Sequence, residues 1–129
     1  MSREIKFRAW LKDAKCFAEI RHISFFEGNT VVKIYDQPMN EEVWFELEDL
    51  ELLQYTGLKD KNGVEIYELD KIKGKFKGGQ HFVMIVGWNE KKTRFDLYTD
   101  KRGNRYGFSA GTVDMGNIEI IGNLLEANS

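Results

Sequence analysis

Apolar and polar residues alternate with a period of two along most of this chain, and this feature restricts it to extended strands. In "EIKFRAW", for example, Ile5, Phe7 and Ala9 fall on one face of a strand, whereas Lys6 and Arg8 fall on the other. Extended segments of this kind cover residues 15–26, 30–36, 43–47, 64–67, 70–77, 80–89, 93–100 and 118–126. The segment "QHFVMIVGWN" is apolar on both faces, which is typical of a central strand.

Turn-forming residues separate these segments. "EGN" at residues 27–29 predicts a hairpin turn, and "DKNG" at residues 60–63 predicts another, because Asn and Gly tolerate the left-handed region of backbone conformation. "YTGL" places Gly57 where a positive φ costs little, so it predicts a turn as well. Asp60 and Asp70 flank turns, where aspartate commonly accepts hydrogen bonds from backbone N–H groups.

Many short strands at close spacing predict a mainly β chain that forms a barrel or a rolled sheet. The charge differs between the halves of the chain. Residues 1–55 hold 7 Lys and Arg against 11 Asp and Glu, a net −4, and residues 56–129 hold 12 against 10, a net +2. This asymmetry and the cluster of turn residues place a boundary near residues 50–56. We therefore expect an N-terminal β lobe over residues 1–52 packed on a second β unit over residues 53–129.

Cysteine use and the apolar runs predict a cytoplasmic protein with no membrane segment. Cys16 is the only cysteine, so no internal disulfide can form, which is typical of a reducing compartment. The segment "MSREIKFRAW" is charged and lacks the continuous apolar stretch of a signal peptide. The longest apolar run, "FVMIVGW", is too short to span a bilayer as a helix.

Residues that commonly catalyse reactions or bind metals are few in this sequence. His22 and His81 are the only histidines, and neither has a second His or a Cys at the spacing of metal ligands. Cys16 can form a dyad with a histidine only through tertiary contacts, and neither a "GxSxG" elbow nor a phosphate-binding loop occurs. The acidic run between residues 41 and 51 is typical of a solvated face. We therefore expect no catalytic residue, no metal and no cofactor.

A stripe of lysines is the most distinctive candidate for binding. Four lysines alternate in "KIKGKFK" and on a strand would project from one face: Lys71, Lys73, Lys75 and Lys77. Such an array attracts phosphate groups through counterion release, and Trp88 and Tyr98 would add stacking surfaces for the bases of a single strand. Lysines on an exposed edge strand also block aggregation, however, and core packing explains the two aromatic residues equally well. Nearby loops add further cations: Lys91, Lys92, Arg94, Lys101, Arg102 and Arg105.

Three blocks of the sequence resemble the YopX family, a group of small proteins encoded by phages and prophages. The blocks are "IKFRAW" at residues 5–10, "LLQYTGLKDKNGVEIYELD" at residues 52–70 and "IEIIGNLLE" at residues 118–126. The family pattern continues with Gly-Asp after the tyrosine block, whereas this chain has Leu69 and Asp70, so the strand geometry around residue 69 is expected to differ. The resemblance implies an SH3-like barrel over residues 53–129, self-association and a bacterial host cell. It implies no activity.

The sequence favours a non-enzymatic binding module that engages another protein or copies of itself. The reason is that plentiful aromatic residues and strand edges occur without a catalytic constellation. The alternative is a nucleic-acid-binding protein that uses the basic strand Lys71–Lys77. An enzyme of unknown type comes third. A deep pocket that holds His81 or Cys16 beside a carboxylate would support it.

Overall fold

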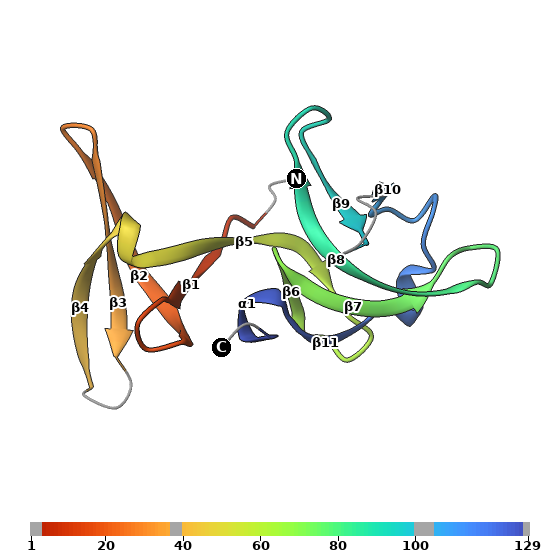
Figure 1. Cartoon of the computed structure of the whole chain (residues 1–129), viewed down its shortest axis with the longest axis horizontal. Coiled ribbons are helices and arrows are strands. Elements are labelled where there is room, and N and C mark those ends of the chain that lie inside the picture. The colour runs from red at the N-terminus through yellow and green to blue at the C-terminus, as the bar shows by residue number, and fades with distance from the viewer. Residues whose placement is uncertain (1–3, 37–39, 100–104, 128–129) are drawn as a thin grey trace. The chain divides into compact units, whose positions relative to one another are not determined.

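The computed structural model of the chain describes residues 4–36, 40–99 and 105–127, and it confirms a mainly β protein (Figure 1). The strands are β1 (Phe7–Leu11), β2 (Cys16–Phe26), β3 (Asn29–Asp36), β4 (Glu41–Glu46), β5 (Leu50–Lys59), β6 (Glu65–Tyr67), β7 (Asp70–Lys75), β8 (His81–Asn89), β9 (Arg94–Tyr98), β10 (Arg105–Gly107) and β11 (Glu119–Asn123). Two 3₁₀ turns and one short helix accompany them: η1 (Leu47–Asp49), η2 (Met115–Asn117) and α1 (Leu124–Ala127). Within the described residues, no helix has the length and apolar character needed to cross a membrane.

The chain divides into two compact units between Gln54 and Tyr55. Residues 5–54 form the N-terminal unit, and the C-terminal unit begins at Tyr55. The boundary expected from the sequence lies two residues earlier, between residues 52 and 53. The strand β5 takes part in both units, because its residues up to Gln54 pair with β1, whereas Tyr55 and Lys59 pair with β6.

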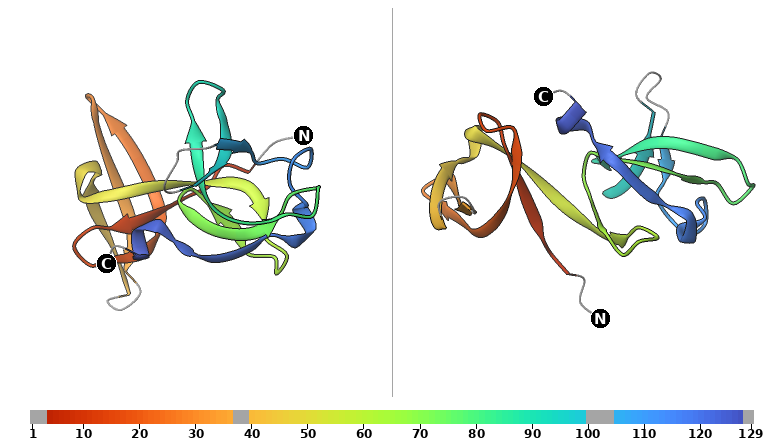
Figure 2. Two further views of the ribbon diagram at one scale, coloured as in Figure 1. Left: turned by 45° about the vertical axis from the view of Figure 1, so that its right-hand side comes forward. Right: turned by 90° about the horizontal axis from the view of Figure 1, so that it is seen from below.

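The strands of the N-terminal unit form one antiparallel sheet in the order β4-β3-β2-β1-β5. The predicted turn at residues 27–29 is confirmed, because Glu27 and Gly28 adopt φ angles of 47° and 81° and close the β2–β3 hairpin. The strand predicted at residues 43–47 is present as β4, and the 3₁₀ turn η1 follows it. The sheet curls around a small apolar cluster (Figure 2). Its buried members are Ala9, Leu11, Val32, Ile34 and Leu50.

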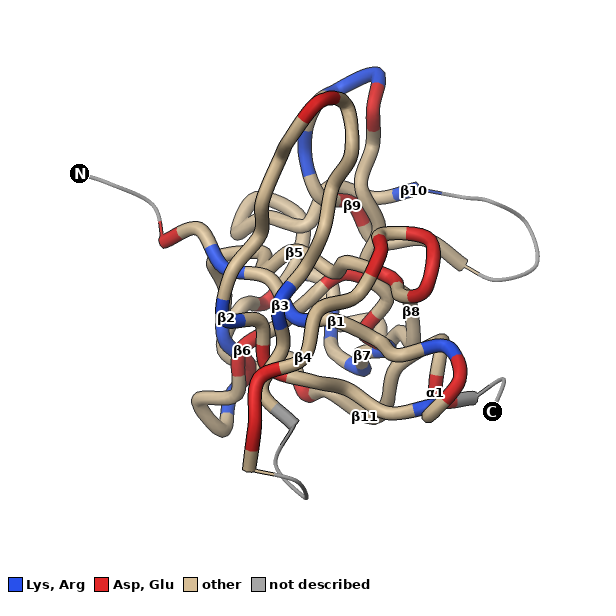
Figure 3. Tube along the Cα trace, turned by 90° about the vertical axis from the view of Figure 1, so that its left-hand side faces the viewer, with Lys and Arg blue, Asp and Glu red and all other residues tan. Residues whose placement is uncertain are grey.

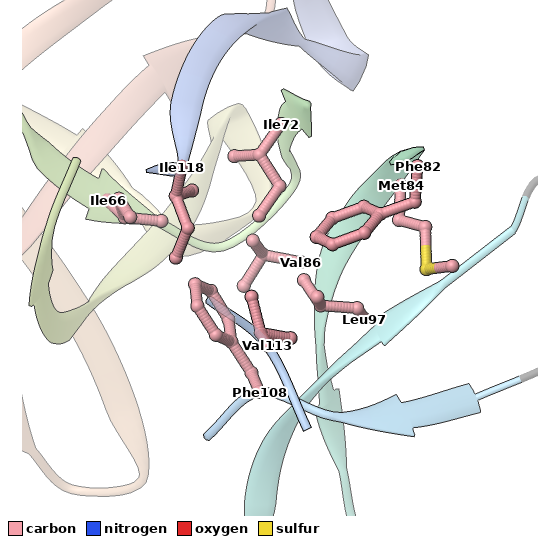
Figure 4. Close-up of a cluster of buried hydrophobic side chains, with 9 residues drawn as sticks. All are labelled: Ile66, Ile72, Phe82, Met84, Val86, Leu97, Phe108, Val113 and Ile118. Carbon is pink, nitrogen blue, oxygen red and sulfur yellow. The ribbon is translucent and has the colours of Figure 1, made fainter. Parts of the chain in front are cut away.

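The C-terminal unit contains a second antiparallel sheet in the order β10-β9-β8-β7-β11. The strand β8 lies in the middle and pairs with β7 and β9, which confirms the prediction of a central strand. One face of this sheet packs against side chains from β6 and from the segment that leads to β11, and together they form the larger core of the chain (Figure 4). The buried members of this core are Ile66, Ile72, Phe82, Met84, Val86, Leu97, Phe108, Val113 and Ile118.

Two expectations for the C-terminal unit differ from the structure. Within the described residues the sheet does not close into a barrel, because its edge strands β10 and β11 stand at opposite ends of the strand order and do not pair. The SH3-like barrel over residues 53–129 is therefore not confirmed. The positive φ expected at Gly57 in "YTGL" is confirmed at 87°, but it lies inside β5, where the pairing with β6 shifts in register, and not in a turn. A bulge uses the same backbone freedom as a turn without reversing the chain.

Asp60 and Asp70 accept backbone hydrogen bonds, as predicted. Oδ1 of Asp60 accepts from the N–H groups of Asn62 at 2.8 Å and Val64 at 3.0 Å, and these bonds close the "DKNG" turn. Oδ2 of Asp70 accepts from the N–H of Tyr67 at 2.8 Å. Both carboxylates are buried, so these hydrogen bonds replace the water that the charged groups lose on folding.

The backbone is unusual where the chain departs from the family pattern. Leu69 adopts a φ of 67°, in the left-handed region that branched and bulky residues rarely enter. Its N–H donates to the carbonyl of Val86 at 2.8 Å, and its carbonyl accepts from the N–H of Leu124 at 2.9 Å. These two hydrogen bonds hold Leu69 in a conformation that glycine would adopt without strain.

Candidate functional site

The lysine stripe follows β7 and projects mostly from the face of the sheet opposite the core. Ile72 is fully buried in the core, so its neighbours Lys71 and Lys73 project from the other face, as does Lys75. Lys77 lies beyond the end of β7, in the turn to β8. The strand β7 is not an edge strand, because it pairs with β11 on one side and with β8 on the other. Protection of a free edge therefore does not explain these lysines.

The two candidate aromatic residues lie on opposite faces of the sheet. Tyr98 stands opposite Ile85 of β8, which stands opposite Lys71 of β7, so Tyr98 shares the lysine face. Its ring lies against Gly87, where a β-carbon would come within 2.3 Å of a ring atom. Trp88 falls on the core side of β8 by strand alternation, and its ring packs edge to face on a β9 neighbour with centroids 5.0 Å apart. The structure thus brings Tyr98, but not Trp88, to the face that carries the lysines.

A pocket of about 450 Å³ opens beside the end of β7 and the start of β8, where lysines from two parts of the chain converge. It is lined by Lys61, Lys73, Gly74, Lys75, His81, Phe82, Val83 and Asn117. Lys61 is absent from the sequence-based candidates. It reaches the pocket because it belongs to the "DKNG" turn, where its N–H donates to the carbonyl of Ile118 at 2.8 Å.

Glu119 compensates part of the positive charge at this pocket. Its Oε2 lies 2.9 Å from Nζ of Lys61 and 3.9 Å from Nζ of Lys73. The hydrogen bond from Lys61 and the charges of both lysines hold the pKa of Glu119 below its ordinary value, so the carboxylate is ionised at neutral pH. Lys75 and His81 form no side-chain hydrogen bond or ion pair with any described residue. With the histidine counted as neutral, three lysines minus one glutamate leave a charge of +2, and the charge of the adjacent Asp60 is met by three backbone N–H groups.

Asp60 holds the turn that carries Lys61 against β11. Its Oδ2 accepts from the N–H of Ile120 at 3.2 Å, a residue 60 positions further along the chain. Burial raises the pKa of Asp60, but three backbone hydrogen bonds and the charge of Lys61 lower it by more, so it lies below its ordinary value. The charged carboxylate therefore fixes the position of Lys61 at the pocket.

Catalytic groups do not converge at this pocket. His81 lines it, but no acidic side chain does, and the nearby carboxylate of Glu119 is engaged by lysines. Cys16 is exposed in the N-terminal unit, and the His22 ring stands edge-on to Trp44 with centroids 5.8 Å apart. In the part of the chain that the structure describes, no three His, Cys, Asp or Glu side chains are grouped so that they could hold a metal ion. This arrangement suits the binding of an anion better than acid–base chemistry.

Cations of the neighbouring loops stay apart from the pocket. Nε of Arg94 donates to Oδ1 of the buried Asp96 at 2.7 Å, and the guanidinium carbon of Arg105 lies 5.1 Å from the ring centroid of Tyr98. The remaining loop cations are Lys91 and Lys92, which are exposed in the β8–β9 turn, and Lys101 and Arg102, which lie outside the described residues.

The N-terminal unit exposes aromatic side chains that its own core does not use. Phe25 and Phe26 end β2 at the tip of the β2–β3 hairpin and are 78% and 69% exposed (Figure 1). Trp44 of β4 is half exposed, and Nζ of Lys33 lies 5.2 Å from its ring centroid. The strand β4 is an edge of this sheet and begins with two glutamates (Figure 3). An apolar tip and an acidic edge thus occur in the same unit.

Comparison with known proteins places the chain by family and by fold. A family model described as "YopX protein" matches residues 6–129. The crystal structure of protein EF1440 from Enterococcus faecalis is similar over 99% of this chain and 98% of that chain, with a TM-score of 0.63 and 23% sequence identity. At this identity the likeness shows a shared fold alone. No curated protein matches the sequence.

Proposed function

The chain belongs to the YopX family, and we propose that it is a non-enzymatic binding protein of phage or prophage origin that contacts another protein in the bacterial cytoplasm. The observation that carries this proposal is the pair of adjacent phenylalanines at the tip of the β2–β3 hairpin, Phe25 and Phe26, which are 78% and 69% exposed.

These two side chains do not serve the fold of their own unit. They lie outside the apolar cluster that the N-terminal sheet encloses. Burial of a phenylalanine side chain contributes about 1.5–3 kcal/mol, and aromatic residues that protrude from a rigid scaffold are common anchors of protein interfaces. The hairpin turn at Glu27 and Gly28 presents the two rings on opposite faces of a two-stranded support, because successive residues of a strand alternate between faces. A partner with an apolar groove would therefore gain most of its affinity from this tip.

The charge of the N-terminal unit indicates that the partner is a different protein and not a second copy of this chain that pairs edge to edge. The free edge β4 begins with Glu41 and Glu42. In a centred antiparallel pairing of two such edges, Glu41 of one copy would stand opposite Glu46 of the other, and like charges on paired strands are destabilising. We therefore expect a partner whose contact surface has an apolar centre and a basic rim. Self-association through another surface is an alternative outcome of the experiment below.

Affinity capture from a bacterial lysate, combined with size-exclusion chromatography and light scattering, tests the proposal. The Phe25→Ser, Phe26→Ser double variant should retain at least tenfold less of a defined partner protein than the native chain. Ile121→Ser is the matched control, because Ile121 is also exposed, at 45%, but belongs to the C-terminal unit. Equal retention by both variants, or a strict monomer that captures no defined protein, would refute the role of the tip.

A second function, nucleic-acid binding, is favoured by one specific observation. Three lysines of β7 project from a single face of the sheet, and Tyr98 shares that face. Binding of a single strand there predicts an affinity that falls steeply with salt. The fall should be less steep for Lys73→Ala combined with Lys75→Ala, because fewer counterions are then released. Undetectable binding at low salt would remove this candidate.

A further inference from the structure

We propose that the pocket of the C-terminal unit binds a phosphate monoester that carries a flat apolar group, with a mononucleotide as the simplest example. The pocket is lined by lysines of the "DKNG" turn and of β7, and by His81, Phe82 and Val83 at the start of β8. This site is separate from the hairpin tip and does not depend on the protein-binding proposal.

Charge balance points to a ligand with two negative charges. Lys61, Lys73 and Lys75 contribute +3, and Glu119, which bridges the first two, contributes −1. A phosphate monoester carries a charge of about −1.5 to −2 at neutral pH, which matches the remaining +2. A carboxylate or a phosphodiester carries a single charge and would leave one lysine uncompensated. Lysine ammonium groups contact phosphate as compact point charges and need no fixed bidentate geometry.

One lysine is available to a ligand without breaking an existing contact. Nζ of Lys61 is 2.9 Å from Glu119, so part of its charge is already used. Lys75 forms no side-chain hydrogen bond or ion pair with the described residues, and the same is true of His81, which also lines the pocket. Lys75 and His81 stand opposite each other in the β7–β8 pairing. A phosphate placed between them would receive donors from two strands.

Apart from Asn117, the remaining wall of the pocket is apolar and suits the organic part of such a ligand. Val83 is 57% exposed although it is aliphatic, and Phe82 contributes to the floor. Gly74 lets the Phe82 ring pack closely against β7, because a β-carbon at this position would stand 3.0 Å from that ring. The volume of about 450 Å³ lies within the range of small-molecule sites, which is about 300–1,000 Å³. An aromatic base or a similar flat group can therefore cover Val83 while its phosphate reaches the lysines.

The position of Glu119 argues against a long polyanion as the ligand at this place. A strand that follows the lysines of β7 would pass Lys73, beside which Glu119 is held by its ion pairs. A carboxylate within the track repels a phosphate backbone, whereas it leaves room for one dianion on the Lys75 side of the pocket. A monoester therefore fits the arrangement better than a nucleic-acid chain.

Calorimetric titration of the full chain with adenosine monophosphate tests the proposal at fixed ionic strength. We expect adenosine monophosphate to bind at least tenfold more tightly than adenosine, which lacks the charge, and than a dinucleotide joined by a single phosphodiester. Inorganic phosphate should bind more weakly than the mononucleotide, because it cannot cover Val83. Equal binding of adenosine and its monophosphate would overturn the proposal. Tighter binding of an oligonucleotide at equal phosphate concentration would assign the face to nucleic acid instead.

Variants of β7 supply the matched control. Lys75→Ala should weaken binding of adenosine monophosphate by about tenfold, the size of one lost charge-assisted contact. Lys71→Ala should change it by less than about twofold, because Lys71 projects from the same face but does not line the pocket. Circular dichroism verifies that both fold, and Lys75→Gln is the second variant if Lys75→Ala does not. Equal losses of affinity in the two variants would show that the positive charge of the face acts as a whole, and would refute binding in the pocket.

Discussion

The two units of this chain are both built on small antiparallel sheets, but they bury different kinds of side chain. The buried residues described in the N-terminal unit are all apolar. The C-terminal unit also buries polar and charged residues, namely Thr56, Asp60, Asp70, Asp96 and Asn123. Apolar burial is non-directional, whereas a buried carboxylate must be met by hydrogen-bond donors at defined positions. Among the described residues, the C-terminal unit therefore positions its loops through buried polar groups, whereas the N-terminal unit buries apolar side chains.

The buried polar groups of the C-terminal unit connect segments that are distant in sequence. Asp60 joins the "DKNG" turn to β11, and Oδ1 of Asp70 accepts from Nδ2 of Asn123 at 3.0 Å across 53 positions. In the N-terminal unit, cationic side chains lie over aromatic rings, such as Lys33 over the exposed Trp44. Such surface contacts contribute little to stability. A site that requires lysines at fixed positions therefore fits the C-terminal unit, and an adaptable contact surface fits the N-terminal one.

Removal of a buried carboxylate is the strongest test of this contrast. Asp60→Ala leaves three backbone N–H groups without their acceptor and should lower the free energy of unfolding by about 3 kcal/mol. Asp13→Ala is the control in the N-terminal unit, because Asp13 is exposed in the β1–β2 turn, and should change it by less than about 0.5 kcal/mol. Urea unfolding followed by circular dichroism measures both. Similar changes in the free energy of unfolding for the two variants would show that the buried carboxylate does not stabilise the C-terminal unit in this way.

Glycine substitutions sharpen the contrast in packing. Gly87→Ala would place a β-carbon 2.3 Å from the Tyr98 ring and should destabilise the protein by about 2 kcal/mol. Gly28→Ala meets no atom within 4 Å, so only its φ of 81° opposes it, at a cost of about 1 kcal/mol. Thermal unfolding measures the loss of stability in the two variants, and the loss should be larger for Gly87→Ala. In a double-mutant cycle, Tyr98→Ala should remove most of the effect of Gly87→Ala, and a cycle without coupling would contradict the contact.

Acid should weaken the C-terminal unit through Asp60. The folded-state pKa of this carboxyl lies below its ordinary value of 3.8, so its contribution to stability is present above that value and is lost as the pH falls through the lower, folded pKa. Urea unfolding at a series of pH values below about 5 should therefore show a smaller loss for Asp60→Asn than for the native chain. Parallel pH profiles for the two proteins would contradict this role of Asp60.

Local sequence patterns predict the strands and tight turns of this fold, but not the number of neighbours that each strand has. The turns at residues 27–29 and 60–63 follow from residue types that tolerate the left-handed region, and the central place of β8 follows from its two apolar faces. The strand β7 has lysines that are typical of an edge, yet β11 covers that edge from more than 40 positions away. The pairing of two strands so distant in sequence depends on the fold of the whole chain, so local patterns do not predict it.

Local sequence patterns also predict part of the candidate site, but not the residues that distant segments bring to it. Alternation places Lys71, Lys73 and Lys75 on one face. It does not place Trp88, because β8 is apolar on both faces, and only the structure shows that Trp88 shares the parity of the core residues of β8. Lys61 is not predictable as a pocket residue from its position in a turn. The available signal is Asp60, whose place before "KNG" indicates a rigid turn, but its bond to β11 becomes visible only in the structure.

The smallest expected effect on stability concerns two ion pairs on the surface, one in each unit. Glu119 lies 2.9 Å from Lys61, and Glu42 lies 3.5 Å from Lys33. Exposed pairs stabilise proteins only slightly, so Glu119→Gln and Glu42→Gln should both leave the midpoint of urea unfolding nearly unchanged.

The two variants should nevertheless differ in ligand binding. Glu119→Gln raises the charge at the pocket from +2 to +3 and should tighten adenosine monophosphate binding by about threefold, since attraction between partly screened charges is of this order. Glu42→Gln lies in the other unit and should have no effect. If Glu119→Gln weakens binding instead, the carboxylate must act by positioning Lys61, and the charge-balance argument for a dianion would fail.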